Sequence, residues 1–432
     1  MDAPPHPFRI PNFRAYWAAR LAMTLAQNAM IIVIGWQAYA IARRTMDQSH
    51  AAAQLGLIGL CQFLPLFLTT PVTGLIADRF DRRYIVRITV FLQLLCAATL
   101  GYATWSGAMT LGIVFTVAVL LGLARAFAGP AFGALAPNLV PKEVLPTAIA
   151  LSSTSWQAGA IVGPAIGGYA YSLAPSAAYI VASVLFAVAF VAVLQITPVP
   201  RPKRLVGVHP LRQIVDGLVY VGQNKLVLGS ITLDLFAVFL AGTSALLPIY
   251  AADVLHVGER GLSLLAAAPA VGAAITAAIF SFRPIKTNVG PKMLGAVIVY
   301  GTATIVFGLS TVMPLSLAAL AVAGAADMFS VYIRSTLVQL HTPDAMRGRV
   351  GAVSQLTISA SNELGEAESG FLASALGPVG AVLVGGGGAI VVTMLWTFLF
   401  PALRAARTFD PPSSLIDLPK TGGRDLELEI TP

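Results

Sequence analysis

The sequence has few charged residues. Only 11% of its 432 residues are Asp, Glu, Lys or Arg, against roughly 25% in an ordinary soluble domain. Hydrophobic residues make up 57% and occur in uncharged blocks of about twenty, the length that a helix needs to cross a bilayer. The low charge excludes a soluble fold, and the lack of strand-like alternation argues against a β-barrel. We expect an all-α polytopic membrane protein.

Cysteine and histidine are also scarce. The two cysteines, Cys61 and Cys96, lie inside apolar blocks away from histidines and acidic clusters, so we expect neither a disulfide nor a metal site. The five histidines fall outside the apolar spans, and no Walker or HExxH pattern occurs. These absences argue against a membrane enzyme. The proline-rich segment Met1–Phe13 has no apolar stretch before a cleavage site, so we expect the first span itself to direct insertion.

Twelve apolar spans are predicted. Their approximate ranges are 17–42, 54–77, 85–105, 108–128, 145–172, 177–196, 226–250, 261–282, 291–312, 314–338, 350–375 and 378–403. The loops on the side of the two termini are rich in Lys and Arg, whereas the other loops contain only Arg43, Arg44 and Arg260. The positive-inside rule therefore places both termini in the cytoplasm, and it explains the net charge of +8 without a nucleic-acid partner.

The longest interior break divides the spans into two sets of six. It is proline-rich and basic at its start and continues into an amphipathic stretch with Leu211, Ile214, Val215, Leu218 and Val219. The predicted units are a six-helix bundle over 1–196, a cytoplasmic linker with one amphipathic helix over 197–225, a second six-helix bundle over 226–407, and a disordered tail over 408–432.

The loop between spans 2 and 3 packs five charges into the segment Gly74–Tyr84. It resembles the signature of the major facilitator superfamily, of the form G-x-x-A-D-R-x-x-R-R. Gly74 would let another helix approach closely, and Asp78 would face the positive N-terminus of span 11 near Gly348. Interdomain ion pairs are expected from Arg79, Arg82 and Arg83, which would form a cytoplasmic gate. Simple anchoring of positive charge inside the cell is the alternative.

Span 5 carries a second motif, composed of Gly159, Gly163, Pro164, Gly167 and Gly168. This arrangement resembles a pattern, G-x-x-x-G-P-x-x-G-G, that the same superfamily associates with exporters exchanging substrate for protons. In lipid, such residues also permit close helix packing and a kink. The motif favours export over uptake, and a packing face of small residues is the alternative reading.

Charged residues inside the spans are candidates for function, because burying charge in lipid is costly. The isolated ones are Arg20, Arg125, Asp234, Asp327 and Arg334, and Arg125 resembles the arginine of the superfamily's span-4 motif, which couples protonation to movement. Span 11 is unusually polar, with Ser359, Asn362, Glu363 and Glu366 at helical spacing along one stripe and Glu368 pointing away.

A buried carboxylate can carry a proton, because desolvation disfavours its charged form. We expect Glu366 to be the proton carrier, with Asp327 and Glu363 next; structural salt bridges to Arg20, Arg125 or Arg334 are the alternative. No cofactor is expected besides the proton gradient. A mid-sized, partly polar organic substrate would suit the amide, hydroxyl and aromatic side chains predicted to line its pocket. These are Asn28, Trp36, Gln37, Gln62, Trp156, Gln157, Tyr332, Ser359 and Asn362.

Three further segments resemble one branch of the superfamily, which contains the enterobactin exporter and the drug and macrolide efflux proteins. They are Phe8–Trp17, His209–Leu211 and Thr342–Val350. The resemblance covers the chain to about Arg407 and implies twelve helices and an exporter of siderophores or hydrophobic drugs in the bacterial inner membrane. We expect the protein to be a monomer. The second half's counterpart of the loop motif, Phe282–Lys286, departs from the pattern, which puts a symmetrical second gate in doubt. An uptake symporter, or a channel, remains the alternative.

Overall fold

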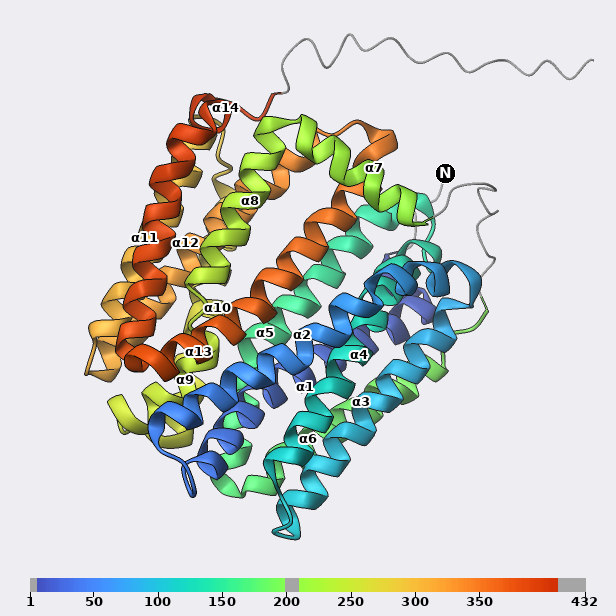
Figure 1. Ribbon diagram of the computed structural model, residues 1–432. Coiled ribbons are helices and arrows are strands. Elements are labelled where there is room, and N and C mark those ends of the chain that lie inside the picture. Colours follow the sequence, from blue (N-terminus) through green and yellow to red (C-terminus); the bar gives the residue numbers. More distant parts are fainter. Residues whose placement is uncertain (1–5, 199–209, 411–432) are drawn as a thin grey trace, which may run out of the picture.

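The computed structural model describes residues 6–198 and 210–410 and shows a bundle of long helices (Figure 1). In this part of the chain, ten helices are long and apolar enough to cross a membrane. One of these ten contains two crossings, because its backbone reverses at Gly377. A further helix, over Leu145–Leu173, is also long enough, although its Ser, Thr, Gln and Gly residues lower its hydropathy. Together these give the twelve crossings that the sequence predicts.

The first six crossings form one helix group. They are α1 (Pro11–Ala42), α2 (Gln48–Arg79), α3 (Arg82–Trp105), α4 (Leu111–Leu135), α5 (Leu145–Leu173) and α6 (Pro175–Leu194), with the short turns η1 (Pro7–Arg9), η2 (Ala136–Asn138) and η3 (Lys142–Val144). Side-chain caps start several of them. Asp47 accepts a bond from the His50 amide at the start of α2, and Asp81 does the same for Arg83 at the start of α3.

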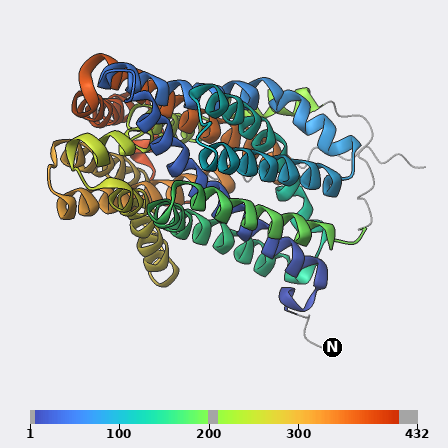
Figure 2. The same cartoon turned by 90° about the horizontal axis from the view of Figure 1, so that it is seen from below.

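The remaining crossings form the second helix group. They are α8 (Lys225–Leu240) with η4 (Ser244–Leu246), α9 (Leu247–Ile249) and η5 (Tyr250–Val254), then α10 (Gly258–Phe282), α11 (Val289–Leu309), α12 (Met313–Leu340), α13 (Asp344–Leu399) and the short α14 (Pro401–Ala405). Figures 1 and 2 show its yellow-to-red helices on one side of the bundle and most of the blue-to-green helices on the other. We call the end with both termini the terminal end and the other the opposite end.

The seventh crossing is not the continuous helix that the sequence predicts. The α8 helix stops at Leu240, residues 241–243 are not helical, and the chain resumes as short helical turns up to Val254. Two carbonyls released by the break have new donors: Tyr300 donates to the Ala241 carbonyl at 3.0 Å, and Ser369 donates to the Gly242 carbonyl at 2.6 Å. A break inside a membrane is tolerated when neighbouring helices satisfy the backbone in this way.

The helix groups meet along two pairs of helices, α2 with α13 and α5 with α10. Glycines make both contacts close. A Cβ atom on Gly56 would lie 2.8 Å from the Ala367 carbonyl oxygen, and one on Gly168 would overlap the Ser263 hydroxyl. The packing therefore brings the backbones of the two groups together, and it places span 11, in the first part of α13, against the first group.

Polar contacts also join the groups at the opposite end. Tyr39, near the end of α1, donates a hydrogen bond to Asp253, and Arg43 lies 3.9 Å from the same carboxylate. Arg260 donates to the Ser172 hydroxyl at 3.2 Å. These contacts hold the two groups together at the opposite end.

The linker helix α7 (Pro210–Gln223) packs on the second group at the terminal end. Arg349 of α13 pairs with Asp216 at 3.0 Å, and Gly217 packs against the Arg349 backbone. Val215, Leu218 and Val219 are exposed, as the face of an amphipathic surface helix would be. Residues 199–209 of the linker, residues 411–432 of the predicted disordered tail, and the Leu211 and Ile214 side chains lie outside the described residues.

Candidate functional site

A cavity lies between the helix groups, about halfway along the bundle. Its volume is about 60 Å³, room for on the order of four waters. Helices α1, α2, α3, α4 and α6 form most of its wall, and the broken seventh crossing and α13 complete it. The polar lining residues are Gln27, Gln62, Gln93, Arg125, Ser244 and Glu366. A cavity enclosed by both groups would change shape when they move.

Glu366 is the carboxylate that faces this cavity. Close contact between α2 and α13 sets its position, because a Cβ atom on Gly59 would lie 3.1 Å from the Glu366 Cβ and 2.9 Å from the Ala367 amide. Within residues 6–198 and 210–410, its carboxylate has no ion pair or hydrogen bond. An acid without a cation at this depth is costly unless it is protonated or binds a ligand.

Arg125 and Glu363 lie beside Glu366 and are bound to one another. The Arg125 Nη1 atom lies 2.8 Å from the Glu363 Oε1 atom and donates to the side-chain oxygen Oε1 of Gln62 at 3.0 Å. Gly122, one turn before Arg125, makes this possible, because a Cβ there would lie 2.3 Å from the Gln62 backbone oxygen. Arg125 thus contacts both α2 and α13, and the salt bridge considered as the alternative role for Glu363 is present.

A second acidic cluster lies entirely within the second group. Arg334 of α12 pairs with Asp234 of α8 at 2.8 Å, and both side chains are about 95% buried. Asp327 lies next to this pair, and with Tyr300 and Ser330 it lines a cavity of about 10 Å³. Asp327 has no ion pair within the described residues, and the buried Ser330 hydroxyl has no hydrogen-bond partner there. The cluster has two carboxylates and one cation.

Arg20 does not join either cluster. Its guanidinium donates to the Tyr16 hydroxyl at 2.8 Å, one turn away on α1. Of the three arginines considered as salt-bridge partners, Arg125 and Arg334 pair with carboxylates, whereas Arg20 has no ion pair within the described residues. In the part of the chain described, no group of three or more His, Cys, Asp or Glu side chains is placed to hold a metal ion.

The glycines of the span-5 motif form packing contacts. A Cβ atom on Gly159, Gly163 or Gly167 would lie 2.5–2.6 Å from atoms of α1, and one on Gly168 would collide with α10. The buried Pro164 lies inside the continuous helix α5. The motif therefore fits α5 tightly between α1 and α10, and its association with proton exchange is a separate prediction.

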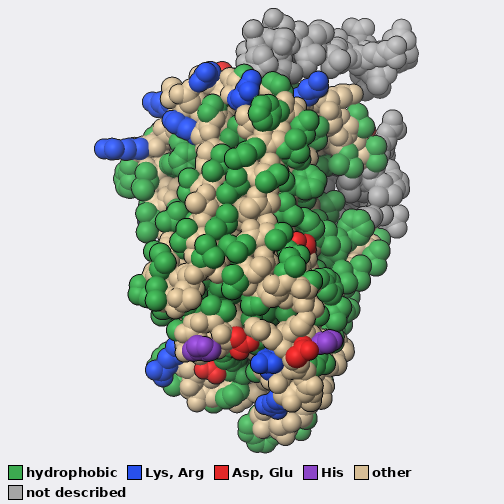
Figure 3. Space-filling view, turned by 60° about the vertical axis from the view of Figure 1, so that its left-hand side comes forward, with side chains coloured by type: hydrophobic (Ala, Val, Ile, Leu, Met, Phe, Trp, Pro, Cys, Tyr) green, Lys and Arg blue, Asp and Glu red, His purple; other side chains and the backbone are tan. Residues whose placement is uncertain are grey.

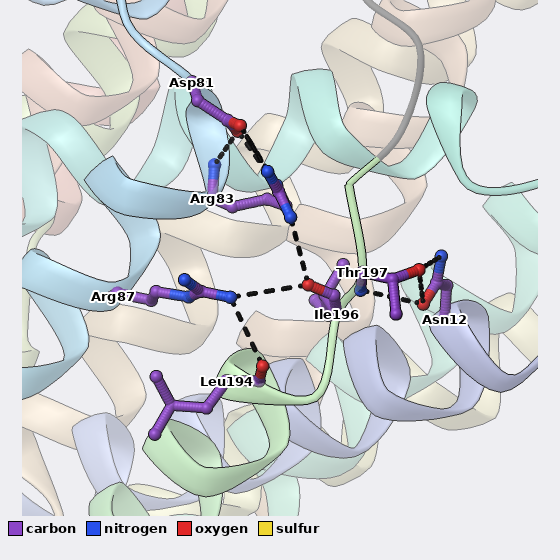
Figure 4. Close-up of polar contacts among 7 residues, drawn as sticks. All are labelled: Asn12, Asp81, Arg83, Arg87, Leu194, Ile196 and Thr197. Carbon is purple, nitrogen blue, oxygen red and sulfur yellow. Dashed lines mark hydrogen bonds and ion pairs between the residues drawn. The ribbon is translucent and has the colours of Figure 1, made fainter.

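The loop motif after span 2 is only partly described. The side chains of Gly74, Asp78 and Arg79, and hence the predicted contact of Asp78 with span 11, lie outside the described residues. Arg82 is half-buried and engaged with its surroundings. Figure 4 shows that Asp81 holds the Arg83 guanidinium, and that Arg83 and Arg87 donate to the Ile196 carbonyl at 3.3 and 3.4 Å.

In this conformation, Arg83 forms no ion pair between the two halves within the described residues, because Asp81 is two residues away and the carbonyls at the end of α6 are within reach. Its predicted role in a cytoplasmic gate stays a prediction. Carbonyls at a helix C-terminus attract cations. Arg83 and Arg87 thus fasten α3 to the end of α6, within the first group.

Of the predicted substrate-lining residues, Gln62 lines the cavity, and the other eight do not belong to its lining. Gln37 is buried and bonded to Thr104 and Tyr179, and Asn28 donates to its own helix at the α1–α5 contact. Trp156 is 53% exposed, and Tyr332 packs against Phe280. Trp36, Gln157, Ser359 and Asn362 are likewise not among the residues that line this cavity.

Three polar lining residues were missed, namely Gln27, Gln93 and Ser244. Gln27 donates to Gln93 at 2.6 Å across the cavity wall, and Ser244 follows the break in the seventh crossing. Asn28 was predicted to line the cavity instead of its neighbour Gln27. Adjacent residues lie on different faces of a helix, so only Gln27 lines the cavity. Gln93 is an uncharged polar residue in an apolar span, a signal that could have found it.

Comparison with known proteins agrees with the fold. Residues 23–366 match the model of the Major Facilitator Superfamily. The chain is 26% identical to the enterobactin exporter EntS of Citrobacter koseri over 414 residues, which cover 93% of this chain and 94% of that protein. It is 25% identical to EntS of Escherichia coli over 417 residues, covering 94% and 96%.

Solved structures show the same architecture at low identity. A peptide transporter POT aligns with a TM-score of 0.72 at 12% identity, covering 93% of this chain and 99% of that one. The nucleoside transporter NupG aligns with a TM-score of 0.71 at 13% identity, covering 90% and 99%. With the family match over most of its length, this chain belongs to the Major Facilitator Superfamily and is a secondary transporter of a small molecule, a multi-pass protein of the inner membrane.

Proposed function

We propose that this protein exports a small organic molecule, of the siderophore or hydrophobic drug-like class, in exchange for protons. The observation that carries the proposal is the position of Glu366, an acid without a cation partner that faces a cavity between the two helix groups. A single carboxylate there can bind either a proton or a substrate. The likeness to enterobactin exporters over more than nine-tenths of the chain supports export.

The coupling proton is assigned first to Glu366. Asp327 is the second candidate, since it also lacks a cation partner within the described residues and lies beside the Arg334–Asp234 pair. Glu363 follows, because its pairing with Arg125 stabilises its charged form. The Arg125 pair also connects the groups, so protonation of Glu363 would weaken a contact between them.

Transport is proposed to work by alternating access, with the first group (1–196) and the second group (226–407) moving as two bodies around the cavity. The opposite end is held by the Tyr39–Asp253 and Arg260–Ser172 contacts. A cavity with room for a few waters cannot hold a drug-sized molecule, so the groups must separate to admit one. We also propose that the protein works as a monomer embedded in lipid.

Both termini are proposed to lie in the cytoplasm. Figure 3 shows Lys and Arg side chains gathered at the terminal end, whereas acidic and histidine side chains join the basic ones at the opposite end. This distribution fits the positive-inside rule. Cysteines placed at Arg9 and at Gly107 would test it in intact cells: an impermeant maleimide should label only the one at Gly107, and labelling of Arg9→Cys alone would reverse the assignment.

The function is tested by a substrate screen in inside-out membrane vesicles that contain this protein. Siderophores and hydrophobic drugs should accumulate in the vesicles when the interior is acidic, and a protonophore should abolish the accumulation. Glu366→Gln should remove the dependence on the proton gradient. Accumulation only under the reversed gradient would indicate an uptake carrier, and transport that never saturates would indicate a channel; either result would contradict the proposal.

A further inference from the structure

The charges around the cavity leave one acid without a counter-ion. The titratable groups that face Glu366 within the described residues are Glu363 on its own helix and Arg125 from α4. These two neutralise each other at 2.8 Å. The polar groups from α1, α2, α3 and η4 are amides and a hydroxyl, which carry no charge. With Glu366 ionised, the cavity therefore has a net charge of −1.

The cation of the cavity already has a counter-ion. The Arg125 guanidinium lies 2.8 Å from the Glu363 carboxylate, so an anionic substrate would meet a pair that is already neutral and would compete with Glu363 for its positive charge. The same anion would be repelled by Glu366. A cationic substrate meets the opposite situation, because the carboxylate it needs has no partner to displace except a proton.

The rest of the wall is apolar. Ile31, Ile34, Leu55 and Ile58 line the cavity from α1 and α2, Phe186 from α6 and Pro248 from the broken seventh crossing. Such side chains favour a lipophilic body, and an aromatic ring attracts a cation positioned over its face. The cavity thus combines an apolar wall with one negative charge, that of ionised Glu366.

We propose that the preferred substrates are lipophilic organic cations with a single positive charge, whose charge replaces the proton on Glu366. The inference rests on the proposed function and adds the charge of the substrate and the way it competes with the proton. Binding of the cation converts a neutral carboxyl into a carboxylate paired with the cation and releases one proton. Exchange of one proton for one monovalent cation is electroneutral, so a pH gradient would drive it and a membrane potential would not.

Two ions of the same shape and opposite charge test this inference. Tetraphenylphosphonium and tetraphenylborate would each be titrated into the purified full-length protein in detergent, with binding measured by equilibrium dialysis and proton release by a pH dye in weak buffer. Tetraphenylphosphonium is expected to bind with release of one proton per site, and its Kd should fall as the pH rises. Tetraphenylborate is expected to bind at least tenfold more weakly and to release no proton.

Variants connect the effect to Glu366. Glu366→Gln should abolish proton release and raise the Kd for tetraphenylphosphonium at least tenfold, and Glu366→Asp should preserve proton release. Glu368→Gln, two residues further on the same helix, is the matched control and should bind like the unaltered protein. If Glu366→Gln does not yield a monodisperse protein, the pH dependence of binding to the unaltered protein decides alone.

The inference is overturned if tetraphenylborate binds as tightly as tetraphenylphosphonium, or if tetraphenylphosphonium binding is independent of pH. Proton-driven accumulation of neutral or anionic compounds in vesicles, without tetraphenylphosphonium binding, would contradict the charge assignment and leave the export proposal standing. If vesicles that contain the unaltered protein show no proton-driven transport of any compound, the export proposal itself is contradicted.

Discussion

Arg125 of α4 and Glu363 of α13 form an ion pair of 2.8 Å that joins the first helix group to the second. Glu363 is almost fully buried, whereas a third of the Arg125 side chain is exposed. The two residues are far apart in the chain, so their contact depends on how the two groups pack against each other. It also lies beside Glu366, the acid proposed to exchange a proton for substrate.

The first prediction concerns this pair. Arg125→Gln should lower the free energy of unfolding by about 1–3 kcal/mol, because it leaves Glu363 buried without a counter-ion; the partial exposure of Arg125 keeps the cost below that of a fully buried pair. Arg125→Gln combined with Glu363→Gln should recover part of this loss. Thermal unfolding of the purified variants in detergent completes the double-mutant cycle. Strictly additive effects would show that the two residues are not coupled.

The second prediction compares two aspartates of the second group. Asp234→Asn should destabilise the protein strongly, by about 3–5 kcal/mol, because it leaves the buried Arg334 guanidinium without its carboxylate. Asp327→Asn should be neutral or stabilising, because the substitution removes a charge that has no ion pair within the described residues. The two thermal unfolding temperatures provide the comparison. Equal losses would mean that Arg334 is shared by both carboxylates.

The sequence was sufficient to place the helices, because hydropathy is a local property. The predicted span 145–172 corresponds to α5 (Leu145–Leu173), and the predicted span 314–338 corresponds to α12 (Met313–Leu340). The break after Leu240 was not predicted, because residues 226–250 form a mostly apolar stretch long enough for one span, despite Asp234 and the small polar residues 242–244. The hydroxyls that satisfy the freed carbonyls come from Tyr300 and Ser369 on other helices. Such compensation depends on tertiary contacts.

The candidate site was predictable only in its charged members. A charge inside a span is conspicuous, so Glu366, Arg125 and Asp327 were selected. The partner of each charge was not, because Arg334 lies on the same helix face as Asp327 yet pairs with Asp234 from α8. The neutral polar residues that line the cavity were predicted least well. Gln37 and Gln62 look alike in sequence, but one is bonded within the first group and the other lines the cavity.

The third prediction tests whether the opposite end must open during transport. Ser49 of α2 and Ser374 of α13 lie with their hydroxyl oxygens 3.5 Å apart across the two groups. In a background without Cys61 and Cys96, Ser49→Cys with Ser374→Cys should cross-link under mild oxidation and stop transport, and reduction should restore it. Vesicle transport before and after reduction is the measurement.

A matched control for the cross-link lies inside the first group. Asn12 and Thr197 are bonded at 2.9 Å, so Asn12→Cys with Thr197→Cys places a cross-link that does not connect the groups. This variant should transport normally in both redox states. Full transport by the cross-linked Ser49→Cys, Ser374→Cys protein would show that this end does not open, and alternating access around the cavity would then be contradicted.

The last prediction concerns the reversal between the final two crossings. Gly377 has φ +75° and ψ 165°, a backbone conformation that is essentially restricted to glycine, and no atom would lie within 4 Å of an added Cβ. Gly377→Ala should therefore lower the free energy of unfolding by about 1–3 kcal/mol through backbone strain alone.

The control is Gly387, in the helix that follows, which also has open space around its Cβ position but a helical backbone. Gly387→Ala should be neutral or stabilising, because alanine favours a helix. Thermal unfolding of the two variants separates strain from crowding, and equal behaviour would mean that the chain can turn at Gly377 without a glycine.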